Sequence, residues 1–92
     1  MLIKVEYGAQ ARAAAGTASE SLEVEPGCDL PALARQLAER HGQSLRGLLL
    51  DHEGRPRPSN IAVVGEAMVR WDEPRPLRDG EVVTILSPIS GG

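Results

Sequence analysis

The sequence has almost no aromatic residues and a single cysteine. Its 92 residues include no Phe, one Trp, one Tyr and one Cys. A hydrophobic core must therefore be built from aliphatic side chains. The lone Cys28 can form neither an intramolecular disulfide nor a cysteine-based metal site. A chain of this length favours one compact domain, and we expect residues 1–92 to form it.

Positive charge is also sparse. The formal net charge is −3, Lys4 is the only lysine, and the arginines are scattered from Arg12 to Arg78. No basic stripe could follow a phosphate backbone, so we expect no nucleic-acid partner. No apolar run approaches membrane-spanning length, and the first residues lack the pattern of a secretory signal. We therefore expect no membrane partner and a cytoplasmic location.

Strand patterns stand at the start of the chain. MLIKVEY alternates apolar and charged residues, which predicts a strand with one buried face, and SLEVE repeats the pattern before Pro26 and Gly27 interrupt it. The Ala-rich segment between these runs fits either a short helix that ends at Gly16 or a long hairpin loop. The pattern alone does not decide between the two.

One main helix is predicted next. Asp29 can cap it, Pro31 suits its first turn, and apolar residues recur at helical spacing as far as Gly42, which can end it. The polar segment DHEGRPRPSN then reads as a surface loop. IAVV, MVRW and EVVTIL follow as strands, with a turn at Gly65 and Glu66 between the first two.

This order of elements predicts an α+β fold of the β-grasp type. A small mixed sheet of four to five strands would carry the main helix on one face, and a late strand would return beside the first. In the last strand, alternation places Val83 and Ile85 toward the helix. The outward side chains are then Val82, Thr84 and Leu86.

The chain contains the segments YGAQARAAAG, VVGEAMVRW and LRDGEVVTILSPISGG. These three segments resemble the ThiS/MoaD family of sulfur-carrier proteins, which are ubiquitin-like β-grasp domains. LRDGEVVTILSPISGG is similar to the C-terminal signature of that family. YGAQARAAAG resembles the stretch after the first strand of MoaD-type members, and VVGEAMVRW resembles a central segment. The sequence departs from the pattern at Gly65, where Asn-Gly is usual, at Glu81 and Val82, where an acidic pair is commoner, and at Ser87, which replaces the first of two prolines.

The resemblance implies a carrier rather than an enzyme. An adenylating enzyme related to ubiquitin-activating enzymes would join Gly92 to AMP, and a persulfide donor would convert it to a thiocarboxylate. An acceptor synthase would then receive the sulfur. The chain itself would bind no cofactor and no metal, and ATP would be used by the activating partner.

Physical properties of the last residues agree with such a role. Gly91 and Gly92 have no Cβ and can enter a narrow cleft, while Pro88 stiffens the exit from the last strand. We expect residues 87–92 to form a flexible tail. Besides Gly92 as the carrier group, the expected partner-binding residues are Gly91, Ser90, Ile89, Pro88, Leu86 and Val82.

Two other functions remain open. The chain could be a ubiquitin-like modifier that forms isopeptide bonds through Gly92, or an interaction domain whose tail does no chemistry. The destination of the sulfur is open too. The stretch after the first strand favours molybdopterin synthesis, whereas residues 48–71 resemble carriers for cysteine synthesis. Thiamin-type carriers belong to the same family, and thiazole precursors and thiolated tRNA are further acceptors of it.

Four further residues have mainly structural interpretations. We expect His41 to contact free carbonyls at the end of the helix. His52, between Asp51 and Glu53, is expected in a solvated loop rather than a metal site. A lowered thiol pKa is conceivable for Cys28 before the helix, but it has no partner for nucleophilic chemistry, so a partly buried structural role is favoured. Trp71 is expected to be a packing anchor at the sheet edge.

Overall fold

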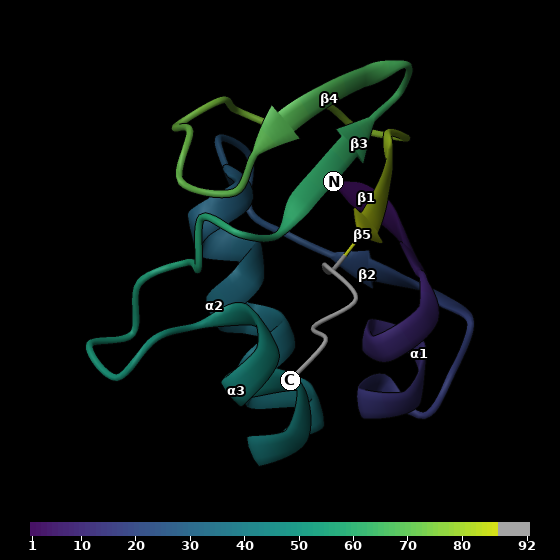
Figure 1. Ribbon diagram of the computed structural model, residues 1–92. Coiled ribbons are helices and arrows are strands. Elements are labelled where there is room, and N and C mark those ends of the chain that lie inside the picture. The colour runs from purple at the N-terminus through teal and green to yellow at the C-terminus, as the bar shows by residue number, and fades with distance from the viewer. Residues whose placement is uncertain (87–92) are drawn as a thin grey trace.

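The computed structural model describes residues 1–86, and the predicted tail 87–92 lies outside them. Five strands and three helices follow one another along the chain (Figure 1). Their bounds are β1 Leu2–Tyr7, α1 Ala9–Ala15, β2 Ser19–Glu23, α2 Leu30–His41, α3 Gln43–Leu49, β3 Ile61–Val64, β4 Ala67–Arg70 and β5 Val82–Leu86.

All five strands form one mixed sheet in the order β2-β1-β5-β3-β4. The last strand, β5, lies in the centre, parallel to β1 and antiparallel to β3. Helix α2 lies against one face of this sheet (Figure 1). A hairpin, a crossover helix and a returning central strand are the predicted β-grasp arrangement, so the fold prediction is confirmed.

Helix α2 begins and ends where the sequence predicts. The Asp29 carboxylate accepts a hydrogen bond from the Ala32 backbone N–H at 3.0 Å, which satisfies one of the free donors of the first turn. Gly42 has a φ of 83° and ends the helix, because residues with a Cβ rarely adopt that conformation.

The structure contains two short helices besides the predicted main helix. Residues 9–15 are helical and end at Gly16, which has a φ of 78°, so the helix alternative is correct for this segment. Helix α3 was not predicted. It starts directly after Gly42 and buries Leu45 and Leu49, which are four residues apart and therefore lie on one side of it.

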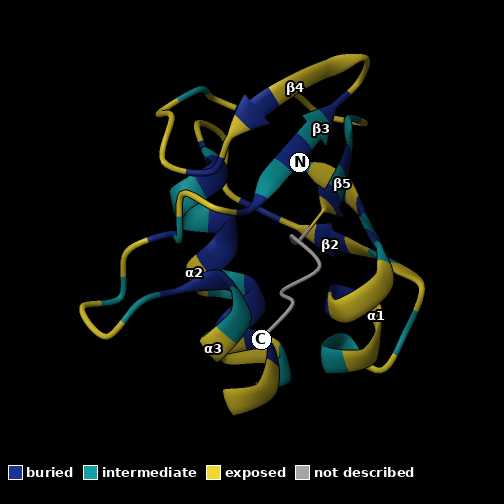
Figure 2. Ribbon diagram, in the orientation of Figure 1, coloured by how far each residue is buried: buried dark blue, intermediate teal, exposed yellow. Residues whose placement is uncertain are grey.

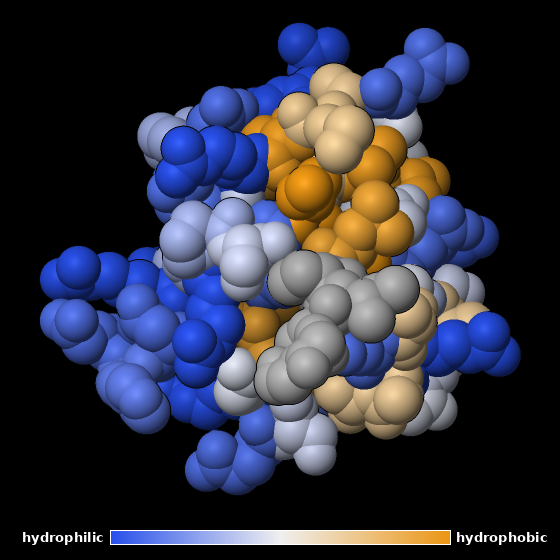
Figure 3. Space-filling model, viewed as in Figure 1, coloured by the Kyte–Doolittle hydropathy of each residue, from blue (hydrophilic) through white to orange (hydrophobic). Residues whose placement is uncertain are grey.

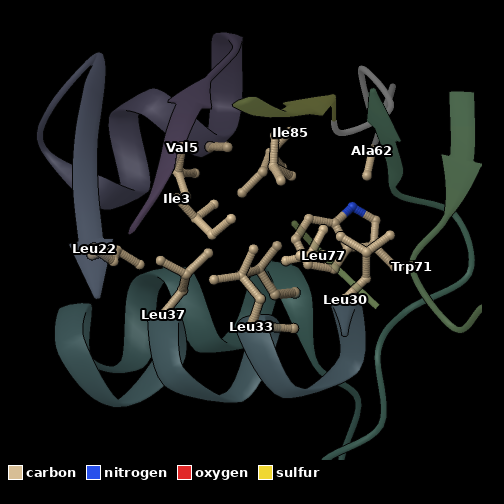
Figure 4. Packing of buried hydrophobic residues seen from close by; sticks show 14 of the residues in the cluster. Ile3, Val5, Leu22, Leu30, Leu33, Leu37, Ala62, Trp71, Leu77 and Ile85 are labelled. Atoms are coloured by element: carbon tan, nitrogen blue, oxygen red, sulfur yellow. The ribbon is translucent and has the colours of Figure 1, made fainter. Parts of the chain in front are cut away.

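The core fills the space between the sheet and the helices. Figure 2 shows buried residues along α2 and along the strands of the sheet. Figure 4 shows Leu30, Leu33 and Leu37 of α2 pointing toward strand side chains. Trp71, which follows the edge strand β4, is 1% exposed and lies beside Leu77. Its predicted role as a packing anchor is confirmed, and most of the core is aliphatic.

The expectation for His41 is wrong. Its imidazole Nε2 contacts the carboxylate of Glu20 on β2, and lies 3.3 Å from the Tyr7 hydroxyl, instead of reaching helix carbonyls. Tyr7 donates a hydrogen bond of 2.6 Å to Glu20, and Arg40 donates another of 2.6 Å. This Glu20 cluster ties the end of α2 to β1 and β2, because one carboxylate on β2 interacts with one side chain of β1 and two of α2.

Burial decides the state of Cys28. The side chain is 8% exposed, and burial followed by the nearby Asp29 carboxylate raises the pKa of the thiol. A lowered pKa is therefore wrong, whereas the structural role is supported. His52 is exposed, as predicted, and no group of three His, Cys, Asp or Glu side chains within residues 1–86 is placed to hold a metal ion. None of the described helices is long and apolar enough to cross a membrane.

Candidate functional site

The central strand β5 contributes to both faces of the sheet. Val83 and Ile85 are fully buried under the helices, whereas Leu86 is 41% exposed. Val82 and Thr84 are half-buried on the same side as Leu86. The predicted register of the strand is therefore confirmed. We call the side of the sheet opposite α2, with Val82, Thr84 and Leu86, the open face.

The LRDGE segment fixes the start of β5 against β1. Asp79 Oδ1 accepts from the Leu2 backbone N–H at 2.7 Å, and the Gly80 N–H donates to the Leu2 carbonyl at 2.7 Å. Glu81 Oε1 accepts from the Arg78 N–H at 2.7 Å. Gly80 has a φ of 84°, which explains why glycine stands in this turn. The segment that resembles the family signature therefore sets the register of the central strand.

The end of β5 is held on both sides. The Gly8 N–H donates to the Ile85 carbonyl at 3.1 Å, and Leu86 pairs with Ile61 of β3. A Cβ atom on Gly8 would lie 3.3 Å from Leu86 Cδ2, so the two residues are in close contact. The position of Leu86 is thus determined by β1, β3 and the start of α1, at the end of the described part of the chain.

Apolar side chains gather around β5 on the open face. The register places Ile61 beside Leu86, and Val63 beside Thr84. The next strand adds Met68, which pairs with Val63 and is 69% exposed. Figure 3 shows these apolar side chains as a continuous patch over β3, β4 and β5. A patch of this kind on a small protein is a common feature of partner-binding surfaces.

Sequence reasoning missed Met68. A signal was present, because Met68 alternates with the buried Val69 in MVRW, and the strand pairing decides which face it joins. A hollow of about 230 Å³ lies beside it, between β3 and β4. The exposed large hydrophobic residues of the described chain all alternate onto the open face. They are Leu2, Met68 and Leu86.

Charged side chains border the apolar patch. On β1, Lys4 pairs in register with Val82, and its Nζ lies 3.8 Å from Glu6. Glu6 also accepts a hydrogen bond of 3.3 Å from the Thr84 hydroxyl. On the other side, Arg70 forms an ion pair of 2.9 Å with Asp72. An apolar centre within a polar rim is the usual composition of a protein–protein interface.

The structure therefore brings two of the predicted partner-binding residues together, Val82 and Leu86, on one apolar surface. The other predicted site residues lie outside the described part of the chain. They are Pro88, Ile89, Ser90, Gly91 and Gly92.

Comparisons with known proteins agree with this fold. The ThiS family profile matches residues 5–92. SAMP1 from Haloferax volcanii has a TM-score of 0.84 at 15% identity, with 100% of each chain covered. Urm1 from Trypanosoma brucei has a TM-score of 0.75 at 23% identity, covering 99% of this chain and 95% of that one. At these identities the likeness concerns the fold.

A third structure is more similar in sequence. It is a Pyrococcus furiosus protein described as a candidate molybdopterin converting factor, subunit 1, with 27% identity and a TM-score of 0.74. The match covers 97% of this chain and 99% of that one. No curated protein sequence matches the chain. Because the family profile spans nearly every residue, from β1 through the last glycine, the chain belongs to the ThiS family.

Proposed function

We propose that this protein is a sulfur carrier whose Gly92 carboxyl group is activated and converted to a thiocarboxylate. The observation that carries the proposal is the family match over residues 5–92, which includes both the β-grasp domain and the Gly-Gly segment. The open face supports it, because an apolar surface lies beside the point where β5 ends. A partner bound there would be next to residues 87–92.

Activation is needed because a carboxylate is a poor acyl donor. In the proposed reaction a Gly92 carboxylate oxygen attacks the α-phosphorus of ATP on the activating partner, and pyrophosphate leaves. The terminal sulfur of a persulfide then attacks the acyl carbon, and AMP leaves. A thiol next breaks the sulfur–sulfur bond, which yields the thiocarboxylate of Gly92 and a disulfide on the donor. An ionised sulfur of this kind is a strong nucleophile.

The chain supplies binding and presentation in this scheme. Leu86 and Val82 would contact the activating enzyme and the acceptor synthase through the open face. Gly91 and Gly92 would enter the activating cleft, since neither carries a side chain. Pro88, Ile89 and Ser90 would line the path between the two. The chain is then a carrier and co-substrate, and its partners hold the catalytic groups.

The sulfur acceptor is proposed from sequence likeness. The Pyrococcus furiosus protein described as a candidate molybdopterin converting factor subunit shares 27% identity with this chain over almost its full length. This favours a pterin precursor as the first acceptor to test, ahead of thiazole and cysteine precursors.

Intact mass after incubation with an activating enzyme, ATP and a persulfide donor tests the proposal. We expect the mass change of one oxygen-for-sulfur exchange, and a variant that lacks Gly91 and Gly92 should show none. Conjugates of higher mass would instead identify a modifier. An unchanged mass in the complete reaction would favour an interaction domain without tail chemistry. The cognate activating enzyme must adenylate a known family member in the same assay as a positive control.

A further inference from the structure

A second surface of the molecule lies between α3 and the loop that follows it, away from the open face. A hollow of about 280 Å³ separates the outer side of α3 from the 51–57 loop, which projects beside the helices in Figure 1. Gln43, Arg46 and Gly47 line it from the helix. The loop contributes Asp51, His52 and Arg57, and Leu50 lies between the two.

The loop wall is held by its own hydrogen bonds. The Asp51 N–H donates to the Arg55 carbonyl at 2.8 Å, and the Gly54 N–H donates to the Asp51 carbonyl at 3.0 Å. Asp51 Oδ1 accepts from the N–H groups of Glu53 and Arg55 at 2.9 and 3.0 Å. These bonds close a compact turn, so the hollow has two ordered walls before any ligand binds.

The two guanidinium groups of the hollow form no ion pair with a described carboxylate, unlike those of four other arginines. Arg40, Arg55, Arg70 and Arg75 each lie within 4 Å of a carboxylate. The side chain of Arg46, like those of Arg12, Arg35 and Arg78, makes no hydrogen bond or ion pair with another described residue. Arg57 uses only its Nε, which donates to the Gly47 carbonyl at 2.9 Å. That bond orients the guanidinium and leaves its Nη groups without a described partner.

The carboxylate in the hollow, that of Asp51, already accepts hydrogen bonds from the loop backbone. Hydrogen bonding from the Arg55 backbone, followed by that from Glu53 and by the charges of Arg55 and Arg57, lowers the pKa of Asp51 despite some desolvation. Asp51 therefore stays ionised at neutral pH, and its Oδ1 accepts hydrogen bonds from the loop backbone. It offsets one of the two lining guanidinium charges, and the hollow keeps an excess of positive charge and donors.

We propose that this hollow is an oxyanion site for a phosphate group. Arg46 and the Nη groups of Arg57 would donate to the phosphate oxygens, since guanidinium groups match phosphate geometry. The amide of Gln43 and the His52 ring are further donors at the wall. At roughly 30 Å³ per water molecule in the liquid, the hollow has room for a phosphate and part of the molecule that carries it. The site is independent of the sulfur-carrier proposal.

Amide chemical shifts during titration with inorganic phosphate test the site, with ionic strength kept constant by sodium chloride. We expect saturable shifts in α3 and residues 51–57, and none on β5. Arg46→Gln should weaken the apparent affinity for phosphate at least fivefold without unfolding the protein, because the Arg46 side chain makes no hydrogen bond or ion pair with another described residue. Arg57→Lys keeps the positive charge but loses the planar guanidinium group, so this variant should also have a weaker affinity for phosphate.

The matched control is Arg35→Gln, because Arg35 is exposed on α2 and does not line the hollow. This variant should bind phosphate as the original protein does. Thermal unfolding of each variant shows that it is folded. Shifts that grow linearly without saturation would overturn the proposal, and so would equal affinities for Arg46→Gln and Arg35→Gln.

Discussion

The two faces of the sheet are built from the same strands but differ in what they can do. On the side that the helices cover, Val83 and Ile85 are fully buried in a close-packed core. On the open face the neighbouring residue Leu86 keeps 41% of its surface exposed. Stability should therefore depend on the covered face, whereas partner binding should depend on the open face. Substitutions at adjacent positions of β5 can separate the two properties.

The largest expected effect is on the covered face, at Ile85. This residue pairs with Tyr7 and Ala62 in the centre of the sheet. Ile85→Ala removes buried carbon atoms and leaves a cavity, so the free energy of unfolding should fall by about 3 kcal/mol. Chemical denaturation measures it. Leu86→Ala is the matched control and should cost less than about 1 kcal/mol. Equal losses at both positions would contradict the difference between the faces.

On the open face, Leu86→Glu should reduce binding rather than stability. A charge in the apolar patch should weaken binding to the activating enzyme or acceptor by about 2 kcal/mol, since a few central apolar contacts dominate such interfaces. Unfolding free energy should change by less than about 0.5 kcal/mol. Calorimetric affinity and thermal unfolding of the same sample measure both. Retained affinity with reduced stability would refute the assignment of Leu86 to the partner-binding surface.

The sequence predicts the faces of β5 well because alternation is a local property. Leu86 and Val82 were placed outward from period-two spacing, and the register of the strand agrees. Met68 was missed because its face depends on which strand β4 pairs with. Sheet order is set by contacts between distant segments, which no local pattern contains.

Local sequence patterns also failed to predict helix α3 and the contact of His41 with Glu20. Helix α3 follows α2 after the single residue Gly42 and contains Gly47, so it lacks the length and composition of a clear helical pattern. The Glu20 cluster joins side chains 21 residues apart, Glu20 and His41, across the sheet and a helix. A histidine at a helix end commonly interacts with the free carbonyls of that helix. Only the tertiary structure shows that His41 instead contacts the Glu20 carboxylate.

A smaller effect on the covered side is expected at the Glu20 cluster. Burial alone would raise the pKa of Glu20, but hydrogen bonds from Tyr7, His41 and Arg40 outweigh it and lower the pKa. The ionised carboxylate therefore stabilises the fold at neutral pH. Glu20→Gln should reduce the unfolding free energy by about 1 kcal/mol at pH 7, a modest value because Arg40 is largely exposed.

The pH dependence has a defined sign. Because the folded-state pKa is lowered, the contribution of Glu20 is complete above the ordinary carboxylate value of about 4.3 and is lost as the pH falls through the folded-state pKa. Denaturation curves of the original protein and Glu20→Gln should converge as the pH falls below the ordinary carboxylate value of about 4.3. A stability difference that stays constant over this range would show that the cluster acts through packing alone.

The smallest expected effect concerns Gly8, where the two faces meet at the end of β5. Its φ of −91° is open to alanine, so Gly8→Ala introduces no backbone strain. The added Cβ would lie 3.1 Å from the Ile85 carbonyl and 3.3 Å from Leu86 Cδ2, and Leu86 would have to shift by a few tenths of an ångström. This crowding opposes the entropic gain of replacing glycine, so the unfolding free energy should change by less than about 0.5 kcal/mol.

Gly47→Ala is the matched control for Gly8→Ala, because nothing lies within 4 Å of a Cβ at Gly47 and the residue is inside α3. It should raise the unfolding free energy by about 0.5 to 1 kcal/mol. The methyl resonances of Leu86 should move in Gly8→Ala and stay in place in Gly47→Ala. A stabilisation by Gly8→Ala as large as that of Gly47→Ala, with unmoved Leu86 methyls, would show that Gly8 does not determine how Leu86 is presented on the open face.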